Sequence, residues 1–379
     1  MLILHTAERY APVAGGVEEV VKQISTRLAR RGHEVHVATS FGISNRRHEI
    51  IDGVQVHRFD VKTEVSFGAS GEVDEYLRFV RSKAWDVIAM HFLPAWSTTA
   101  LLPNLNELES GKVLVGHGFR GFHFPSYRNR IAAITQYLKN LDRIVTLSNL
   151  LEETLLCKQL GLPMPDVIPN GVDFNEWNRP IRQIREKKGI GNRPWLLLVS
   201  NHSPVKSHST FFHVVHRVRR KIPDSVGMII GGCYPAAKWG MGRLGVQGGC
   251  WYRCRLAASL TSDVLLQWDV SREDVVSAIR EADIIMLTSE YEASPLVVIE
   301  SMAAGTPWLS LDVGCMREHV GGVVANNAVE MAEVAVDLIR NPGRRSSLGA
   351  QGIHRARERH CWEFIVNQYE ALYHRLIEE

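Results

Sequence analysis

Short runs of β-branched and aliphatic residues alternate with amphipathic segments along this chain, and the alternation occurs twice, before residue 166 and after residue 194. Such alternation is typical of parallel sheets whose faces are covered by helices, because each strand returns through a helical crossover. The chain has 379 residues, more than a single hydrophobic core usually supports. The sequence therefore predicts an α/β protein built from two doubly wound domains.

The first domain is expected over residues 1–165. Its first strand, at 2–6, leads through Gly15-Gly16 into an amphipathic helix that Gly32 ends. Further strands are predicted at 34–39, 54–59, 86–90, 113–116 and 143–147. Helices are predicted between them at 73–83, 96–108 and 149–160.

Residues 166–194 interrupt this alternation. The stretch contains Pro169-Asn170-Gly171 and other turn-forming residues but no apolar periodicity, which favours a crossover between domains. The second domain, at 195–360, restarts the pattern, and Ser271 is a suitable N-cap within it. We expect its strands at 195–200, 227–232, 264–268, 283–288 and 307–311, and its helices at 208–221, 272–281 and 296–304.

Two further segments of the second half have a distinct composition. Residues 233–254 are rich in Gly, aromatic residues and Arg, and we expect a loop or flap there. Residues 328–379 are expected to be helical, with a break at Asn341-Pro342-Gly343. Two doubly wound domains also predict a ligand cleft at the carboxyl ends of their strands.

Charge and cysteine content exclude several classes of protein. The chain has 44 Lys and Arg against 41 Asp and Glu, a net charge of +3, which does not indicate a nucleic-acid binder. No apolar run approaches the ~18 residues that span a bilayer. The N-terminal sequence MLILHTAERY is too short in its apolar part for a signal peptide, and six cysteines in so long a chain do not indicate a disulfide framework. We therefore expect a soluble, cytoplasmic protein.

Two features are candidates for binding a phosphate. Gly15-Gly16 opens a helix after the first strand, where free N–H groups and a close backbone approach suit an anion, although the G-x-G-x-x-G spacing is absent. Lys206 follows the first strand of the second domain and can neutralise a diphosphate. Each also has an ordinary interpretation: Gly15-Gly16 would form a tight turn without a ligand, and Lys206 would be a solvated surface lysine.

Glu292 and Glu300 form a third candidate. Seven residues separate them, with Glu292 in the loop before a helix and Glu300 inside it, so that their carboxylates can contact opposite ends of one bound molecule. Carboxylates accept hydrogen bonds from hydroxyl groups, which suits a sugar or a ribose. Surface glutamates are common, however, and the spacing alone indicates little.

The surrounding motifs resemble those of a known family. The segment EASPLVVIESMAAGTP resembles the E-x7-E signature of the retaining group 1 glycosyltransferases, glycosyltransferase family four, and GGVE after the first strand and IPNGVD at 168–173 match the same family in order. HCWEFIVNQYEALY resembles its aromatic-bearing final helix. The resemblance implies a GT-B architecture of two Rossmann-like domains, with a final helix, at 361–379, that returns to the first domain.

The resemblance also implies roles for individual residues. Glu300 is expected to bind the donor ribose, Glu292 the transferred sugar and Lys206 the diphosphate, assisted by Gly16 and by backbone groups around Ser294, Leu296 and Val297. His117, after a strand of the first domain, matches a histidine near the reacting carbon, although a satisfied loop histidine is an equal alternative. His117, Lys206 and Glu292 are the expected catalytic residues.

The expected reaction moves a hexosyl group from a nucleotide diphosphate sugar, with UDP-sugars favoured, to an acceptor hydroxyl. The acceptor would be a polysaccharide, a glycolipid or a metabolite. Departure of the diphosphate creates charge that Lys206 and helix N-termini can stabilise without a metal. No D-x-D occurs in the chain, in agreement with metal-independent transfer. The resemblance implies retention of configuration, with a donor phosphate oxygen taking the acceptor proton, and no cofactor.

The chain departs from the family pattern at two positions. Asn201 occupies the place of an arginine that usually makes a second cationic contact with the diphosphate, and its loss would cost about 1.5–3 kcal/mol. Arg243, Arg253 and Lys238 are candidate substitutes. Ser294-Pro295 replaces a frequent Phe-Gly. These departures leave open a catalytically impaired binding or scaffold subunit, and a nucleotide-sugar epimerase is a further alternative.

Other motifs are weaker. The HEVH segment at 33–36 lacks the H-E-x-x-H spacing, and no C-x-x-C pair supports a metal at Cys233, Cys250 or Cys254, so we expect no metal site. Residues 118–130 interleave aromatic residues with arginines. This segment suits a peripheral contact with an anionic inner-membrane face or stacking on an acceptor sugar, and a packed loop is the alternative.

Overall fold

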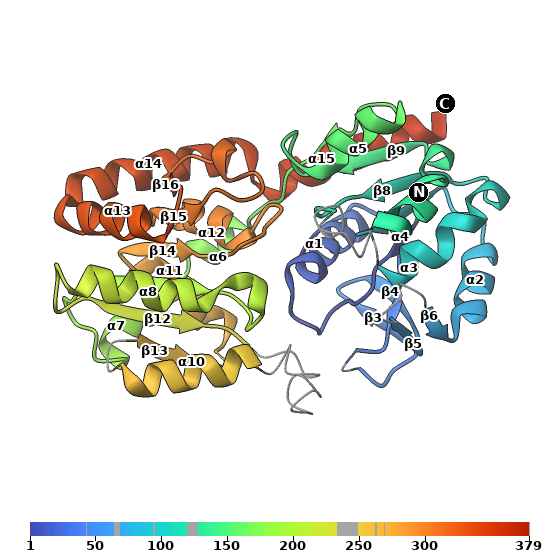
Figure 1. Cartoon of the computed structure of the whole chain (residues 1–379). Helices are drawn as coiled ribbons and strands as arrows, with labels where there is room; N and C mark the ends of the chain where they lie inside the picture. The colour runs from blue at the N-terminus through green and yellow to red at the C-terminus, as the bar shows by residue number, and fades with distance from the viewer. Residues whose placement is uncertain are drawn as a thin grey trace. The chain divides into compact units, whose positions relative to one another are not determined.

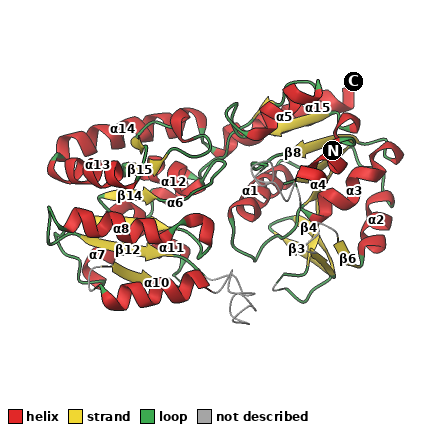
Figure 2. Ribbon diagram, viewed as in Figure 1, coloured by secondary structure: helices red, strands yellow, loops and turns green. Residues whose placement is uncertain are grey.

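The computed structural model describes residues 1–42, 44–63, 69–93, 95–119, 128–232, 249–261, 264–268 and 270–378. The chain divides into two compact α/β units, each a sheet with helices on both faces (Figures 1 and 2). The first unit contains residues 1–171 and 362–379, and the second contains residues 172–361. The predicted fold class, two Rossmann-like doubly wound domains, is confirmed by these two sheets.

The first unit has an eight-stranded sheet in the order β10-β9-β8-β7-β1-β2-β4-β3. Its strands are β1 (Leu2–Thr6), β2 (Glu34–Ser40), β3 (His48–Ile51), β4 (Val54–Phe59), β7 (Val87–His91), β8 (Gly111–Val115), β9 (Arg143–Thr146) and β10 (Asp166–Val167). All neighbours pair in parallel except β3 and β4. A separate antiparallel pair, β5 (Val61–Thr63) and β6 (Ala69–Gly71), follows β4.

Helices cover both faces of this sheet. One face packs against α2 (Val73–Arg81), α3 (Trp96–Leu101), a 3-10 turn (Leu102–Glu107) and α5 (Glu152–Leu160), around a core that includes Tyr76 and Trp96. The other packs against α1 (Gly16–Arg30) and the last helix, α15 (Trp362–Glu378). Ion pairs hold α15 to α1, for example Arg27 Nε with Glu363 at 2.9 Å and Arg31 with Glu370 at 2.6 Å. A short helix, α4 (Arg128–Thr135), precedes β9.

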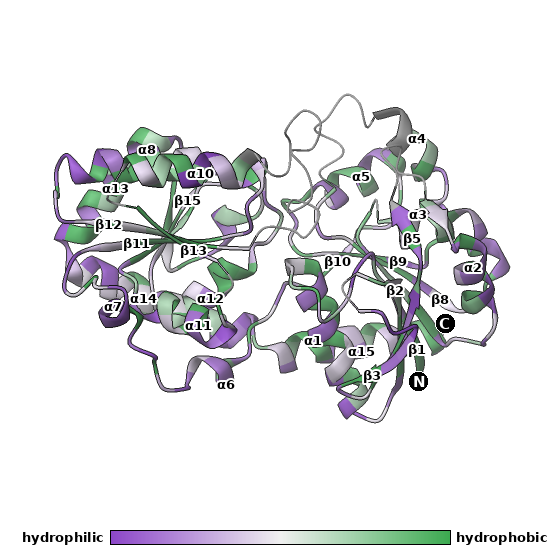
Figure 3. Cartoon of the chain, turned by 90° about the horizontal axis from the view of Figure 1, so that it is seen from below, coloured by the Kyte–Doolittle hydropathy of each residue, from purple (hydrophilic) through white to green (hydrophobic). Residues whose placement is uncertain are grey.

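The second unit has a six-stranded parallel sheet in the order β13-β12-β11-β14-β15-β16. Its strands are β11 (Trp195–Val199), β12 (Val226–Ile230), β13 (Val264–Gln267), β14 (Ile284–Leu287), β15 (Trp308–Leu311) and β16 (Gly322–Ala325). The central strand β11 is an unbroken apolar run because both of its faces are buried, as expected for a parallel sheet. Figure 3 shows hydrophobic colouring along the strands of this second sheet and both colours on its helices.

Alternate residues of β11 point to different helical layers. Leu196 and Leu198 contact one core, formed with α8 (His208–Arg219) and α13 (Ala328–Arg340). Trp195 and Leu197 contact the other, formed with α11 (Arg272–Glu281), α12 (Leu296–Ala304) and α14 (Pro342–Arg359). The α10 helix (Gly249–Leu260) packs on β13 and α8, and two single-turn helices, α6 (Phe174–Trp177) and α7 (Ile184–Lys187), precede β11.

Most of the predicted helices and strands are present in the structure at or near the predicted residues. The break between α13 and α14 falls at Pro342, the first residue of α14, and the Ser271 hydroxyl accepts a bond from the Asp274 N–H at 3.2 Å as the expected N-cap. The helix expected at 96–108 is shorter, because Pro103 follows α3 and the chain continues as a 3-10 turn. The strands β3, β5, β6, β10 and β16 were not predicted.

The prediction of a loop or flap at 233–254 is wrong where it can be compared. Residues 249–254 form the first half of α10, whose Cys254 is buried against the unit. Residues 233–248 lie outside the described residues, as do 120–127 of the basic-aromatic segment. No helix in the described ranges is long and apolar enough to cross a membrane.

Candidate functional site

The second sheet changes direction between β11 and β14. From β11 the chain moves outward through β12 and β13, then returns to pair β14 on the other side of β11. Open α/β sheets bind ligands at the carboxyl ends of the strands at such a switch point. The loops after β11 and β14 carry Lys206 and Glu292, so the fold brings together two residues that are separated by more than eighty positions.

Lys206 and Glu292 form an ion pair. Lys206 Nζ lies 2.6 Å from Glu292 Oε1, and the Ser289 hydroxyl donates to the same oxygen at 2.6 Å. Glu292 is only 8% exposed, so its charge depends on these two donors. No other donor contacts Glu292 within the described ranges, which leaves Oε2 for a ligand.

Hydrogen bonds tie the two loops together at the backbone as well. The Glu290 N–H donates to the Val205 carbonyl at 2.8 Å, and the Thr288 hydroxyl donates to the Lys206 carbonyl at 3.2 Å. Ser207 has φ +45°, a conformation that a residue with a side chain rarely adopts, and its hydroxyl donates to Glu290 at 3.2 Å. Such strain persists only where neighbours over-determine the backbone, so the Lys206 loop is a rigid feature.

A third loop supports the backbone of Glu292. Gly314 has φ +53°, and a Cβ added there would lie 2.3 Å from the Glu292 carbonyl oxygen. The Cys315 N–H donates to the Ala293 carbonyl at 3.0 Å, and Ser294 is hydrogen-bonded to the Cys315 thiol. Burial raises the pKa of this thiol to about 11. Only glycine permits this close approach, which fixes the direction of the segment that leads into α12.

The start of α12 presents backbone N–H groups. Its N-cap is Pro295, which makes no side-chain cap, and the first-turn N–H groups of Leu296 and Val297 have no intrahelical acceptor. Together with the positive end of the helix dipole, they suit a phosphate or a carboxylate. The expected residues Lys206, Glu292, Ser294, Leu296 and Val297 are therefore adjacent features of neighbouring loops.

Glu300 has a different environment from Glu292. Its Oε1 accepts a bond from Arg272 Nη2 at 2.5 Å, and Arg272 also makes two bonds of 2.8 Å to Glu176 of α6. Arg272 lies over the Trp177 ring, 5.7 Å from its centroid. Although burial opposes the charge, the carboxylates of Glu300 and Glu176 raise the pKa of Arg272. Arg272 was not predicted, because its partners come from two other segments.

Asn201 lies in the loop that follows β11 and is half-buried. Gly231 and Gly232, after β12, adjoin this loop, and a Cβ on Gly232 would lie 3.8 Å from the Asn201 side-chain oxygen. Of the three candidate substitute cations, Arg253 is exposed on α10, whereas Lys238 and Arg243 lie outside the described residues.

A group of metal-ligating residues lies on the same loop. His202 and His208 flank Lys206 in sequence, and their side chains lie with those of Cys250 and Cys254 of α10, with all four candidate ligand atoms within 4.8 Å of one another. A hydrogen bond with Cys254 lowers the pKa of the Cys250 thiol against the effect of burial, and His202 and His208 act in the same direction. In the sequence, this cluster is marked only by a C-x3-C and an H-x5-H spacing, neither of which is the C-x-x-C pair expected of a metal site.

In the first unit, Gly16 begins α1, and a Cβ added there would meet no atom within 4 Å. The protein's own atoms therefore do not require glycine at this position, and the role of Gly16 in ligand binding stays a prediction. Gly15, in contrast, has Glu18 beside it, which forms an ion pair with Arg9 at 2.7 Å.

His117, two residues after β8, begins a chain of three imidazoles that continues through His91 of β7 to His5 of β1; His91 and His5 are fully buried and His117 is partly buried. His117 Nε2 lies 3.3 Å from His91 Nδ1, and His91 Nε2 lies 2.8 Å from His5 Nδ1. Burial lowers the pKa of His117 to about 3, so that its ring is neutral at physiological pH. His117 therefore acts as a hydrogen-bonding group and not as a cation.

Glu153 of α5 was not predicted. It is fully buried, and its Oε1 accepts a bond of 2.7 Å from the Gly118 N–H, one residue after His117. Burial raises its pKa from 4.5 to about 7. A buried titratable carboxyl beside the strand ends holds the His117 loop in place.

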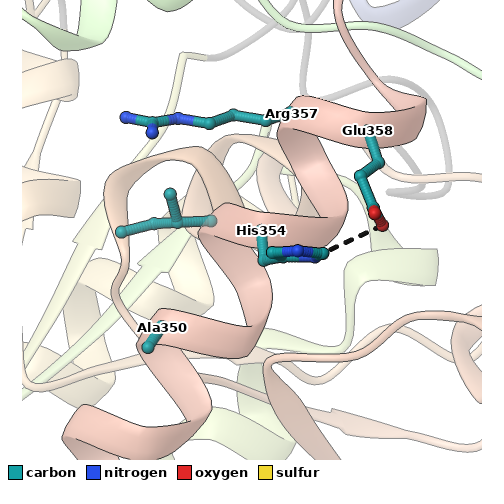
Figure 4. Close-up of a pocket in the computed structure, with 5 residues that line it drawn as sticks. Ala350, His354, Arg357 and Glu358 are labelled. Atoms are coloured by element: carbon teal, nitrogen blue, oxygen red, sulfur yellow. Dashed lines mark ion pairs between the residues drawn. The ribbon is translucent and has the colours of Figure 1, made fainter.

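A hollow on α14 is unrelated to these loops. Its lining consists of Ala350, Ile353, His354, Arg357 and Glu358 (Figure 4). All five come from one helix, and His354 and Glu358 form a surface ion pair at 3.3 Å. None of them belongs to the loops at the switch point.

Comparisons with known proteins cover nearly the whole chain. Residues 14–176 match the family model described as Glycosyltransferase Family 4, and residues 180–355 match that described as Glycosyl transferases group 1. The D-inositol 3-phosphate glycosyltransferase of Xylanimonas cellulosilytica is 24% identical over 96% of this chain and 93% of its own length. The N-acetyl-alpha-D-glucosaminyl L-malate synthase of Bacillus anthracis is 21% identical over 97% and 96%.

Solved structures share the fold. Sucrose-phosphate synthase from Thermosynechococcus elongatus superposes with a TM-score of 0.83 at 19% identity, covering 99% of both chains. HepE from Anabaena, in complex with UDP and glucose, gives a TM-score of 0.75 at 17% identity over 98% of this chain and 99% of its own. These similarities establish the two-domain architecture.

Proposed function

Since this chain belongs to the group 1 glycosyltransferases of GT-B fold, enzymes that use nucleotide-sugar donors, we propose that it transfers a hexosyl group to an acceptor hydroxyl with retention of configuration and without a catalytic metal. The observation that carries this proposal is the Lys206–Glu292 pair beside the uncapped start of α12. The pair offers a cation for a diphosphate and a carboxylate for sugar hydroxyls at one switch point.

The charges of this site suit a donor. Without ligand, Glu292 neutralises Lys206 at 2.6 Å. A bound diphosphate presents more negative charge to Lys206 than one carboxylate does, and the sugar hydroxyls can donate to Glu292 Oε2 in the same event. Glu300, bonded to Arg272, is placed on α12 one helical turn beyond its start and would accept the ribose hydroxyls.

The reaction breaks the bond between the sugar C1 and the donor phosphate oxygen and forms a bond between C1 and the acceptor oxygen. The acceptor proton passes to a phosphate oxygen of the leaving nucleoside diphosphate. Lys206 and the N–H groups of Leu296 and Val297 stabilise the charge that develops on that diphosphate. His117, neutral because of its burial, would contact the sugar through a hydrogen bond.

UDP is the favoured nucleotide, supported by the solved complexes of HepE with UDP and with UDP-glucose. The acceptor would be a polysaccharide, a glycolipid or a small metabolite. The names of the two relatives above point to polar metabolites, an inositol phosphate and malate. For a lipid-linked acceptor, residues 118–130 would contact an anionic membrane, which flotation with phosphatidylglycerol vesicles would test.

Calorimetric titration with UDP-, GDP-, ADP- and dTDP-sugars tests the donor site. The buffer should be passed over a chelating resin but contain no chelator, so that tightly bound ions stay in place. We expect selective binding of a UDP-sugar that is lost in Lys206→Ala, and an α-configured product from an α-linked donor by NMR. Binding of no nucleotide sugar would overturn the proposal and favour an impaired scaffold subunit.

A further inference from the structure

The four-residue cluster beside Lys206 joins two separate segments of the second unit. His202 lies in the loop after β11, and His208 is the first residue of α8. Cys250 and Cys254 lie on α10, which packs against α8 (Figure 3). Three of the four are almost fully buried: His202 is 3% exposed, His208 1% and Cys254 4%. Cys250 and Cys254 are four residues apart and therefore share one helix face.

The distances fit a small tetrahedral ion. His208 Nδ1 lies 3.0 Å from Cys250 Sγ, and His202 Nδ1 lies 3.9 Å from the same sulfur. With Zn–S about 2.3 Å and Zn–N about 2.0–2.1 Å, tetrahedral ligands stand roughly 3.3–3.8 Å from one another. The C-x3-C and H-x5-H spacings fall within those of structural zinc sites.

The ligand chemistry selects zinc. A tetrahedral set of two thiolates and two imidazoles is typical of Zn²⁺. Two thiolates balance the charge of the ion, so that the complete site is neutral, which suits its burial. The Ser200 hydroxyl lies 2.9 Å from His208 Nε2 and can hold the ring with Nδ1 directed at the metal.

A disulfide between the two cysteines fits less well. Residues four apart on a helix have Cβ atoms about 5–6 Å apart. A disulfide requires about 3.5–4.5 Å, so oxidation would distort the first turns of α10. Metal binding needs no such change in the helix.

We propose that His202, His208, Cys250 and Cys254 bind a structural zinc ion that fastens the Lys206 loop to α10. The two histidines stand four residues before and two residues after Lys206, so the ion would fix both ends of the segment that carries the cation. Because the site is neutral, it does not replace the missing positive charge at Asn201; it positions Lys206 instead. The metal site rests on the four residues alone, and its effect on donor binding rests on the proposed function.

Metal analysis of the tag-free full chain tests the site. After purification with zinc present and removal of excess metal, we expect about one zinc per chain by mass spectrometry. Cys250→Ser, Cys254→Ser and His208→Asn should each lose most of it. Cys361→Ser and His213→Asn, matched substitutions away from the cluster, should keep it. A wild-type chain without stoichiometric zinc, or zinc that survives in the cysteine variants, would overturn the proposal.

A second measurement needs no variant and therefore does not depend on their folding. Iodoacetamide labelling, read by peptide mass spectrometry, should spare the partly exposed Cys250 in the zinc-loaded chain and modify it after chelation. Cobalt in place of zinc should give thiolate-to-metal charge-transfer absorption. Equal labelling with and without metal would contradict the site.

The effect on Lys206 has its own readout. Removal of zinc should weaken UDP binding at least several-fold, and adding zinc back should restore it. Zinc bound as expected with unchanged UDP affinity would overturn the positioning role. Failure of all nucleotides to bind would count against the proposed function, while the zinc content and the labelling would still decide the metal site.

Discussion

Lys206 Nζ lies 2.6 Å from Glu292 Oε1, and this ion pair joins the loops that follow two neighbouring strands, β11 and β14. Glu292 is nearly buried, whereas the Lys206 side chain is 29% exposed. The lysine therefore has one side held by the protein and another that faces solvent, from which an anionic ligand can approach. The first two predictions follow from this arrangement.

Lys206→Met should weaken UDP binding by roughly 10- to 100-fold, because a hydrogen bond to a charged group contributes about 1.5–3 kcal/mol. The substitution also leaves the Glu292 carboxylate buried without its cation, which lowers stability. The double variant Lys206→Met/Glu292→Gln should regain stability but not binding. Calorimetry and thermal unfolding measure the two effects, with the exposed Lys221→Met as control. UDP affinity equal to that of the wild type would refute the role of Lys206.

Glu292→Ala and Glu300→Ala should differ in their dependence on the sugar. Glu300→Ala should weaken the binding of UDP and UDP-glucose alike, because the ribose is common to both. Glu292→Ala should weaken mainly the binding of UDP-glucose. Glu333→Ala, on the exposed surface of α13, is the control. Equal losses for both ligands in both variants would contradict this division.

Asn201→Arg should tighten UDP binding by roughly 10- to 100-fold, if the gain matches the usual strength of a charge-assisted contact. Asn192→Arg adds the same charge near the amino end of β11, before the strand, and should leave affinity unchanged. Titration with UDP at two salt concentrations separates a direct contact from general attraction. An unaltered affinity in Asn201→Arg would show that this position does not face the diphosphate.

Glu153→Gln should change how stability depends on pH. The pKa of Glu153 is raised from 4.5 to about 7 by burial, so the folded state keeps a proton that the unfolded chain releases. Stability is lost as pH rises through this interval, by roughly 3 kcal/mol in total. Glutamine can still accept the Gly118 bond without ionising.

The advantage of Glu153→Gln over the wild type should therefore be small at pH 5 and large at pH 8. Thermal midpoints of both proteins across this range measure it, and Glu152→Gln, at the neighbouring position of α5, is the control. A constant difference between Glu153→Gln and the wild type would mean that Glu153 does not titrate in this window.

The local sequence pattern was sufficient to predict most strands of the second sheet. Every residue of β11, with the sequence WLLLV, is apolar because both faces of the strand are covered. The Asn-Pro-Gly sequence separates α13 from α14 because proline is favoured at the first position of a helix. In contrast, HEII pairs as the antiparallel edge strand β3, with only half-buried or exposed residues, and shows too little periodicity to be recognised. The described part of α10 was missed because Gly249 and the glycine-rich sequence before it resemble a loop.

The sequence by itself determined the two doubly wound domains and the positions of Lys206, Glu292 and Glu300, since strand and helix periods and a contiguous motif are local properties. Only the tertiary structure decided which side chains meet. Arg272 reaches Glu300 and Glu176 from another helix, and His208 meets Cys250 across 42 residues. These contacts depend on strand order and helix packing. Both result from burial of the whole core at once, which no short stretch of sequence encodes.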